Sequence, residues 1–362
     1  MASTESSRTS HPFFMYDHIQ AQPAAFVNVV ARNRARLAGL AEEIAACKRL
    51  LLVGIGTSHH AAQIGGSLFR VLAPGVACEV WHSFDFALYG PTLTPDDLVV
   101  AVSHRGTKKF TLRSLVRAKE AGCTTAMITG QGAPSAPLEL NAVYETVEQE
   151  KIAAHTFSYV GAVGVIAELA RQVDGAALLG GELFAETIHA ALTAGLAAEE
   201  QMARWAAEQQ SRRRIWLIGG GPSAVTAREI ALKIKETSYL QAEGLAIETF
   251  LHGSFQCCEA EDLIVLIAPG GPAQSRTLEL TGMIQAIGAK CVLVTDCARA
   301  IDENEVMDSC VVPIVPDPFE ALTCLLPLQL FTYHLARQRG TNPDSFRLDD
   351  PRFAAAMARV KL

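Results

Sequence analysis

The sequence of 362 residues predicts an α/β protein with two tandem domains, each a doubly wound parallel sheet. Short apolar runs alternate with stretches of helical periodicity, which is typical of βαβ units and of a parallel sheet covered on both faces by helices. The same succession of strand, turn and helix occurs twice along the chain. Internal repetition of this kind indicates two similar domains, and the length also fits about two domains of ordinary size.

Each repeat contains three apolar runs that predict buried strands. In the first repeat they open the segments 51–58, 98–106 and 124–129, and the corresponding segments of the second repeat are 216–223, 263–271 and 290–295. The first two segments of each repeat run from a strand into a turn that contains glycine. The sequence therefore predicts matching strands and matching strand-to-helix loops in the two domains.

These patterns divide the chain into four segments. We expect an N-terminal arm and helix at 1–40, a first domain at 41–185, a second domain at 200–345 and a C-terminal tail at 346–362. Residues 1–20 are expected to form a mobile arm whose aromatic end, 11–16, docks on the body of the protein. Helical spacing runs from Pro23 to Cys47, and a helical region from about 181 to 210 joins the domains.

Composition excludes several classes of function. The net charge is −7, so the chain lacks the overall basic field on which nucleic-acid binding usually depends. No apolar run reaches the roughly 18 residues of a membrane-spanning helix, and the polar N-terminus is unlike a secretory signal. The nine cysteines have neither metal-ligand nor disulfide spacing. We expect a cytoplasmic protein that binds no nucleic acid, membrane or metal.

Hydroxyl and cationic side chains gather in two loops of the first repeat. Such loops lie at the carboxyl ends of strands, where α/β sheets bind ligands and where helix N-termini favour anions. The residues are Thr57, Ser58, Ser103, Arg105, Thr107, Lys108 and Lys109. The matching loops of the second repeat consist mainly of glycine and proline and carry few groups able to hold phosphate. The sequence therefore predicts an anion site in the first repeat alone.

The glycines of these loops do not form a nucleotide-binding motif. Gly54 and Gly56 lack the third glycine of G-x-G-x-x-G, because position 59 is His, and no G-K-[ST] loop occurs. This disfavours a nicotinamide enzyme and an NTPase. We expect no cofactor.

A helical segment at 231–243 carries a lysine and glutamates on related faces. Lys233 and Glu236 are three residues apart and share one face, and Glu243 is two turns further along. Taken alone, a solvated lysine–glutamate pair is the commoner interpretation of this spacing. His252 follows between apolar residues, and a histidine in that setting is more often structural than catalytic.

Together these segments resemble the sugar isomerase (SIS) domain family, and within it the isomerase half of glutamine–fructose-6-phosphate amidotransferases. The resemblance runs from about residue 11 to residue 345. Residues 56–58 read G-T-S where the family has C-G-T-S, and 103–108 read S-H-R-G-T-K where it has S-Q-S-G-E-T. Residues 231–239 read A-L-K-I-K-E-T-S-Y against A-L-K-L-K-E-I-S-Y, and 251–253 read L-H-G against K-H-G-P.

The resemblance implies two three-layer αβα domains of flavodoxin or Rossmann type and a homodimer with shared active sites. It implies a sugar phosphate held by Gly56, Thr57, Ser58, Ser103, His104, Arg105, Gly106, Thr107, Lys108 and Thr156. The resemblance further implies that Glu236 shuttles a proton between C1 and C2 of the sugar and that Lys233 supports Glu236. It also implies that His252 of the neighbouring subunit opens the sugar ring. A carboxylate suits an enediol intermediate, and ring opening suits a group that titrates near neutrality.

Departures from the family pattern shape the expected activity. We expect that no glutaminase domain precedes the isomerase part. The tail at 347–353 has no lysine where the family has one that forms a Schiff base, and Lys361 stands in unrelated context. We expect an enzyme without glutamine amidotransferase activity that deaminates or deglycates a phosphorylated amino sugar or ketosamine, because such a substrate supplies its own imine. The alternatives are a plain aldose–ketose isomerase and a sugar-phosphate sensor without catalysis.

Overall fold

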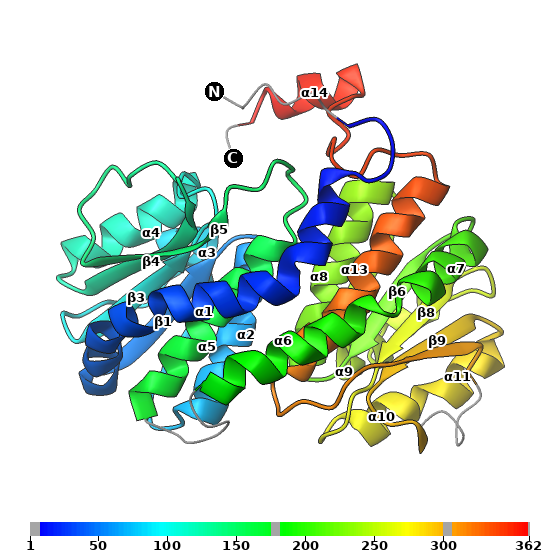
Figure 1. The fold of residues 1–362 in the computed structure, drawn as a ribbon, viewed down its shortest axis with the longest axis horizontal. Coiled ribbons are helices and arrows are strands. Elements are labelled where there is room, and N and C mark those ends of the chain that lie inside the picture. The colour runs from blue at the N-terminus through cyan, green and yellow to red at the C-terminus, as the bar shows by residue number, and fades with distance from the viewer. Residues whose placement is uncertain (1–7, 175–181, 300–305, 361–362) are drawn as a thin grey trace. The chain divides into compact units, whose positions relative to one another are not determined.

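The computed structural model describes residues 8–174, 182–299 and 306–360, so Lys361 lies outside the described residues. The chain divides into two compact units (Figure 1). The N-terminal unit holds 21–150 and the described part of 157–189. The C-terminal unit holds 8–20, 151–156 and the described part of 190–360.

In the described part of the N-terminal unit, parallel strands form one sheet in the order β2-β1-β3-β4-β5. The strands are β1 (Arg49–Gly54), β2 (Cys78–His82), β3 (Asp97–Val102), β4 (Thr124–Gln131) and β5 (Ala142–Glu148). The helices are α1 (Phe14–Ala46), α2 (Thr57–Leu72), α3 (Ser83–Tyr89), α4 (Lys109–Glu120) and α5 (Phe157–Asp174).

Helices cover both faces of this sheet (Figure 1). On one face, Phe86 of α3 and Leu115 of α4 pack in one apolar cluster with Val53 and Val99 of the central strands. On the other face α2 lies against α5, and the close approach is possible because α2 has glycine at position 65, where a Cβ would meet Leu52 and Ile166. The unit is therefore a three-layer αβα domain.

The C-terminal unit repeats this architecture. Its described strands are all parallel in the order β10-β9-β8-β6-β7, which is the same order read from the opposite edge. The strands are β6 (Ile215–Gly219), β7 (Ala242–Ala246), β8 (Leu263–Ile267), β9 (Lys290–Thr295) and β10 (Asp308–Val311). The helices are α6 (Glu182–Leu196, which begins in the N-terminal unit), α7 (Glu199–Gln209), α8 (Pro222–Ser238), α9 (Ile247–Leu251), η1 (Ser254–Cys257), α10 (Gln274–Leu278), α11 (Leu280–Ile287), α13 (Glu320–Gln338) and α14 (Pro351–Met357).

The core of the C-terminal unit lies on both sides of its sheet. Phe250 of α9 and Ile284 of α11 share an apolar cluster with Trp216 and Leu266 of the central strands. On the other side α8 lies against β6, and α13 lies against α8 and α7. The predicted fold class, two tandem doubly wound parallel sheets, is confirmed. No helix in the described part of the chain is long and apolar enough to cross a membrane.

The central strands match the apolar runs, whereas the edge strands had no such signal. The residues of β2 are all half-buried and those of β10 mix buried, half-buried and exposed positions, so neither forms a continuous apolar run. Strands buried on both faces are the ones that read as apolar throughout. The helical region predicted between the domains is confirmed, over its described residues, by α6 and α7.

The N-terminal segment is not a free arm as far as residue 20. Helix α1 begins at Phe14, and Asp344 accepts hydrogen bonds from the backbone N–H groups of Phe14 and Met15 at 2.8 and 3.0 Å. His11 Nδ1 lies 2.8 Å from the hydroxyl of Tyr333, and Phe13 is buried. The expected docking of the aromatic end is confirmed within the C-terminal unit. The expected mobility is wrong for 8–20, because these contacts fix the first turn of α1.

Helix α8 ends earlier than its sequence pattern predicts. The apolar spacing continues through 245, but Tyr239 adopts a left-handed conformation (φ 57°), and Glu243 lies in β7. The last carbonyls of the helix receive hydrogen bonds from residues after α13: Thr341 Oγ1 donates to the Thr237 carbonyl and Arg339 Nε to that of Ser238. Since these partners come from distant sequence, a local pattern does not reveal the end of the helix.

Candidate functional site

Both sheets have a point at which the strand order reverses, between β1 and β3 in one unit and between β6 and β8 in the other. Open α/β sheets bind ligands at the carboxyl ends of the strands at such a point. In the N-terminal unit the loops there are 55–56, before α2, and 103–108, before α4. Because β1 and β3 pair directly, the structure brings the two predicted phosphate loops together.

The loop between β1 and α2 is a tight turn built on glycine. Gly56 has a φ of 57° and directly precedes α2, while a Cβ at Gly54 would lie 2.5 Å from the backbone of Ser58. Thr57 and Ser58 are consequently the first residues of α2, and both are half-buried. Hydroxyls in the first turn of a helix are well placed to join its N–H groups around an anion.

The loop between β3 and α4 begins with an unusual serine. Ser103 is 3% exposed, and its Oγ has no hydrogen-bond partner among the described residues. Its carbonyl accepts a hydrogen bond from the N–H of Gly106, which has a φ of 67°, and Thr107 is exposed. Buried hydroxyls are normally hydrogen-bonded, so this one indicates a group that the loop is built to receive.

Two cations stand in the same loop. Arg105 is exposed, and its guanidinium donates to the carbonyl of Glu150 at 3.4 Å. Lys108 is half-buried at the start of α4, and its pKa is lowered by burial and by the positive charge of Arg105. An anion between the two would relieve their repulsion and favour the charged form of Lys108. The loop is therefore electrostatically suited to phosphate.

His104 differs from its neighbours in the loop. It is buried, and its Nε2 accepts a hydrogen bond from the N–H of Glu150 at 2.9 Å. Its carbonyl receives the N–H of Gly130 and Gln149 Nε2, both at 2.9 Å. These bonds fasten the loop to the ends of β4 and β5. We propose that His104 positions the loop and that its neighbours contact the ligand.

The predicted lysine–glutamate pair lies on α8, and it is buried. Lys233 is 1% exposed, and its Nζ lies 2.6 Å from Glu236 Oε2 and 3.5 Å from Glu229 Oε1. The Glu229 side chain is fully buried, whereas that of Glu236 is 14% exposed. Lys233 thus bridges two carboxylates, of which Glu236 is the accessible one. A solvated surface pair, the commoner interpretation of the spacing, is wrong here.

Glu236 faces a pocket of about 320 Å³ in the C-terminal unit. The pocket is lined by Lys235, Glu236, Tyr239, Leu240, Gln241, Phe346, Arg347 and Phe353. The guanidinium of Arg347 lies 4.7 Å from the ring centre of Tyr239 and 3.8 Å from that of Phe353. These cation–π contacts join the segment after α13 and the first turn of α14 to the end of α8.

Sequence reasoning missed Glu229 and Arg347. The spacing of Glu229 and Lys233, four residues apart on a helix, was a signal that could have revealed the first. Arg347 reaches the pocket from a segment more than a hundred positions away in the sequence, and no local pattern announces it.

His252 and Thr156 do not line the Glu236 pocket in the described part of the chain. The His252 side chain is 75% exposed, with its Nδ1 2.7 Å from the Glu248 carbonyl oxygen and 3.5 Å from Glu248 Oε2. Thr156 is fully buried just before α5. The apolar residues around His252 do not form a free apolar surface, since Phe250 belongs to the core and Leu251 and Phe255 pack against it.

The chain belongs to the SIS domain family, whose model matches residues 43–167 and 209–337. It is 29% identical over 355 residues to the glutamine–fructose-6-phosphate aminotransferase [isomerizing] of Thermococcus kodakarensis, a match that covers 94% of this chain and 58% of the relative. The enzyme of the same name from Methanothermobacter thermautotrophicus is 28% identical, with 94% and 57% covered. The chain therefore spans less than two thirds of the length of these relatives.

Solved structures share the fold. The C-terminal domain of glucosamine-fructose-6-phosphate aminotransferase from Francisella tularensis superposes with a TM-score of 0.81 at 23% identity, covering 94% of this chain and 99% of that one. Tagatose-6-phosphate ketose/aldose isomerase from Escherichia coli gives 0.79 at 17% identity, with 95% and 98% covered. Glucosamine-6-phosphate deaminase from Thermotoga maritima gives 0.73 at 18%, with 92% and 97% covered.

Proposed function

We propose that this protein is an enzyme that moves a proton between C1 and C2 of a phosphorylated sugar at Glu236. The observation that carries the proposal is a carboxylate paired with a buried lysine and open to a pocket. The ammonium of Lys233 favours the ionised form of Glu236, which is the form that abstracts a proton. The relatives named for fructose-6-phosphate and glucosamine-6-phosphate chemistry support a phosphosugar substrate.

The phosphate of this substrate is assigned to the loops of the N-terminal unit. The proposed ligands are Gly56, Thr57, Ser58, Ser103, Arg105, Gly106, Thr107 and Lys108, with Thr156 near the sugar. The unpartnered hydroxyl of Ser103 and the mutual repulsion of Arg105 and Lys108 support this assignment.

We further propose that the reaction removes an amine, by deamination or deglycation of an amino-sugar or ketosamine 6-phosphate. The segment after α13 that lines the Glu236 pocket contributes Phe346, Arg347 and Phe353, none of which can form a Schiff base, and the lysine among the described lining residues is Lys235 of α8. A substrate that carries its own nitrogen forms the imine without a lysine. Plain ketose–aldose isomerisation is the second candidate, because it needs only the carboxylate and the shared fold includes such an isomerase.

The test is a panel of 6-phosphorylated amino sugars, ketosamines and ketoses incubated with the purified protein. Release of ammonia or amine from the nitrogen-bearing members supports the proposal. Conversion of ketoses to aldoses without amine release favours the second candidate. A protein that binds members of the panel and turns over none of them would be a sensor, and the enzymatic proposal would be wrong.

The loop assignment gives a separate expectation for Lys108. Replacing it with glutamine removes one charge-assisted hydrogen bond, so the affinity for inorganic phosphate should fall by about tenfold to a hundredfold. Because burial and Arg105 lower the pKa of Lys108, wild-type affinity should already decline with rising pH before the ordinary lysine range is reached. Calorimetric titration at several pH values measures both effects.

Lys109→Gln is the matched control for this measurement. Lys109 is exposed and its Nζ lies 5.5 Å from the ring centre of Phe110, so its loss should change phosphate affinity far less. Equal losses in the Lys108 and Lys109 variants would show a general charge effect and contradict a built site.

We also propose a homodimer in which each Glu236 pocket is completed by His252 of the other subunit. The proposal is supported by the exposure of His252 and by its absence from the pocket lined by described residues of its own chain. Closed two-fold symmetry would create two identical mixed sites.

Mixing the inactive variants Glu236→Gln and His252→Ala should therefore restore activity. Random exchange produces one intact site in each heterodimer, which corresponds to about a quarter of wild-type activity. A mixture of Glu236→Gln with the double variant is the control and should stay inactive. If verified subunit exchange restores nothing, or if a monomer is fully active, His252 does not act across the interface.

A further inference from the structure

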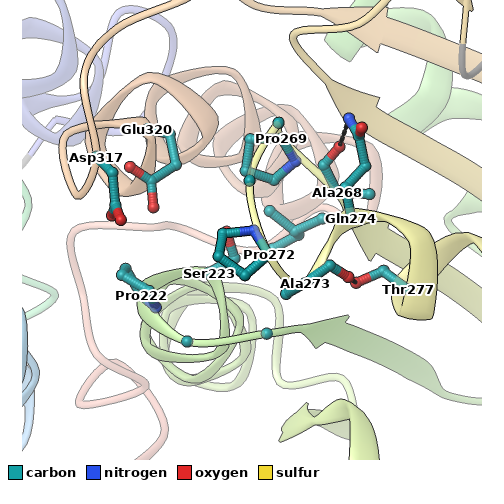
Figure 2. A pocket seen from close by; sticks show the side chains of 15 residues that line it. Pro222, Ser223, Ala268, Pro269, Pro272, Ala273, Gln274, Thr277, Asp317 and Glu320 are labelled. Atoms are coloured by element: carbon teal, nitrogen blue, oxygen red, sulfur yellow. Dashed lines mark hydrogen bonds between the residues drawn. The ribbon is translucent and has the colours of Figure 1, made fainter.

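The C-terminal unit has a pocket of its own at the point where its strand order reverses. It has a volume of about 300 Å³ and lies among the loops after β6 and β8 and the start of α13 (Figure 2). It is lined by Gly220, Gly221, Pro222, Ser223, Ile267, Ala268, Pro269, Gly270, Gly271, Pro272, Ala273, Gln274, Thr277, Asp317 and Glu320. This is the position that corresponds, by the internal repeat, to the phosphate loops of the N-terminal unit. Its size suits a small polar molecule.

Several backbone donors at this pocket are already in use. The N–H groups of Ser223 and Ala224 donate to the carbonyls of Gly220 and Gly221, both at 3.1 Å, and Pro222 has no N–H. The N–H of Gly270 donates to Asp296 Oδ1 at 2.6 Å. No lysine, arginine or histidine occurs among the described residues that line the pocket. Its described lining therefore has no cation to hold phosphate.

Its charged side chains are instead acidic, and one of them is buried with one carboxyl oxygen unpartnered. Glu320 is 7% exposed and lines the pocket, and its Oε2 has no hydrogen-bond partner in the described part of the chain. Figure 2 shows it beside Asp317 at one end of the pocket. Burial, and after it the negative charges of Asp317 and Asp296, raise the pKa of Glu320 to about 8.

A buried carboxyl oxygen without a partner is stabilised by a hydrogen-bond donor. The acidic residues beside it also favour a ligand that carries a positive charge. Asp317 precedes α13, Asp296 follows β9, and Cys324 lies one turn further along α13, and none of these three neighbouring groups is a cation. A primary ammonium provides three donors and a positive charge in one group. A metal ion is less well suited, because no group of three or more potential ligands occurs among the described residues.

We propose that this pocket is a second small-molecule site, which binds the protonated amine of a small polar ligand through Glu320 and Asp317. The site is separate from the Glu236 pocket and does not depend on the proposed reaction. Both carboxylates accept hydrogen bonds from the ammonium, and the glycine and proline loops enclose the remainder of the ligand. A bound ammonium favours the ionised form of Glu320. The Glu320 carboxyl therefore releases a proton to solvent when the ligand binds at neutral pH.

Calorimetric titration of the intact protein with ethanolamine and with ethylene glycol tests the proposal. The two probes have nearly the same size, and only ethanolamine carries an ammonium. We expect saturable binding of ethanolamine alone. Repeating the titration at pH 7 in buffers of different ionisation enthalpy should show release of about one proton. Equal binding of the two probes, binding of neither, or no proton release would overturn the proposal.

Substitutions at the two pockets show which of them binds ethanolamine. Glu320→Gln and Asp317→Asn should each weaken ethanolamine binding by about tenfold or more. Asp317 is exposed, so its variant should fold even if the buried substitution does not. Glu236→Gln should leave ethanolamine binding unchanged. Loss of binding in the Glu236 variant, with binding retained in the other two, would assign the amine to the Glu236 pocket and contradict a second site.

Discussion

The Glu236→Gln variant should lose turnover by ~10²–10⁴-fold while its affinity for the substrate stays within a few fold of wild type. Glutamine keeps the size of the side chain and can still accept a hydrogen bond from Lys233, but it cannot take up a proton. The pocket and the phosphate loops are unchanged by the substitution, so binding should persist. Steady-state kinetics together with a direct binding titration separate the two effects.

Glu243→Gln is the matched control for this variant. Glu243 lies on β7 close to α8 in sequence, is exposed, and is not among the described residues that line the Glu236 pocket. Its turnover should equal that of wild type. Near-normal turnover in the Glu236 variant, or an equal loss in both variants, would contradict the assignment of proton transfer to Glu236.

Replacing Lys233 with methionine should lower the free energy of unfolding by about 3–5 kcal/mol. Methionine fills a similar volume, but the ammonium that separates Glu229 from Glu236 is lost, and two carboxylates are left facing each other beside a buried position. Removal of one partner of a buried ion pair is costly where water cannot reach the other. Urea denaturation followed by circular dichroism measures the change.

Lys235→Met provides the comparison, because Lys235 lies on the same helix but is exposed. Its effect should stay within about 0.5 kcal/mol. Adding Glu229→Gln to the Lys233 variant should recover part of the loss, since one of the facing carboxylates becomes neutral. Equal stabilities of the two lysine variants would mean that the buried bridge does not stabilise the unit.

The sequence was sufficient for the central strands and for the repeat, because strands such as β3 and β8 are buried on both faces and must be apolar along their length. The edge strands and the end of α8 depend on partners from distant segments. Arg339 and Thr341, which bind the last carbonyls of α8, are about a hundred positions away from it.

The candidate site was predictable in part for a similar reason. Spacing placed Lys233 and Glu236 on one helix face, but it did not reveal that the lysine is buried or that Glu229 completes the bridge. The apolar residues beside His252 are visible in the sequence, but not that Phe250 belongs to the core of its own unit. Burial depends on how helices pack on the sheet, and a local pattern reports only which side chains share a face.

The proposed reaction requires one carboxylate to transfer a carbon-bound proton. Turnover of the best substrate of the panel in deuterium oxide, followed by nuclear magnetic resonance, tests this directly. Glu236 is partly exposed, so over many turnovers some of the protons that it holds should exchange with solvent before they return. Deuterium should therefore accumulate at C1 or C2, and the Glu236→Gln variant should show no such accumulation. Product and recovered substrate that stay free of deuterium at both carbons after many turnovers would contradict an enediol or enolamine route.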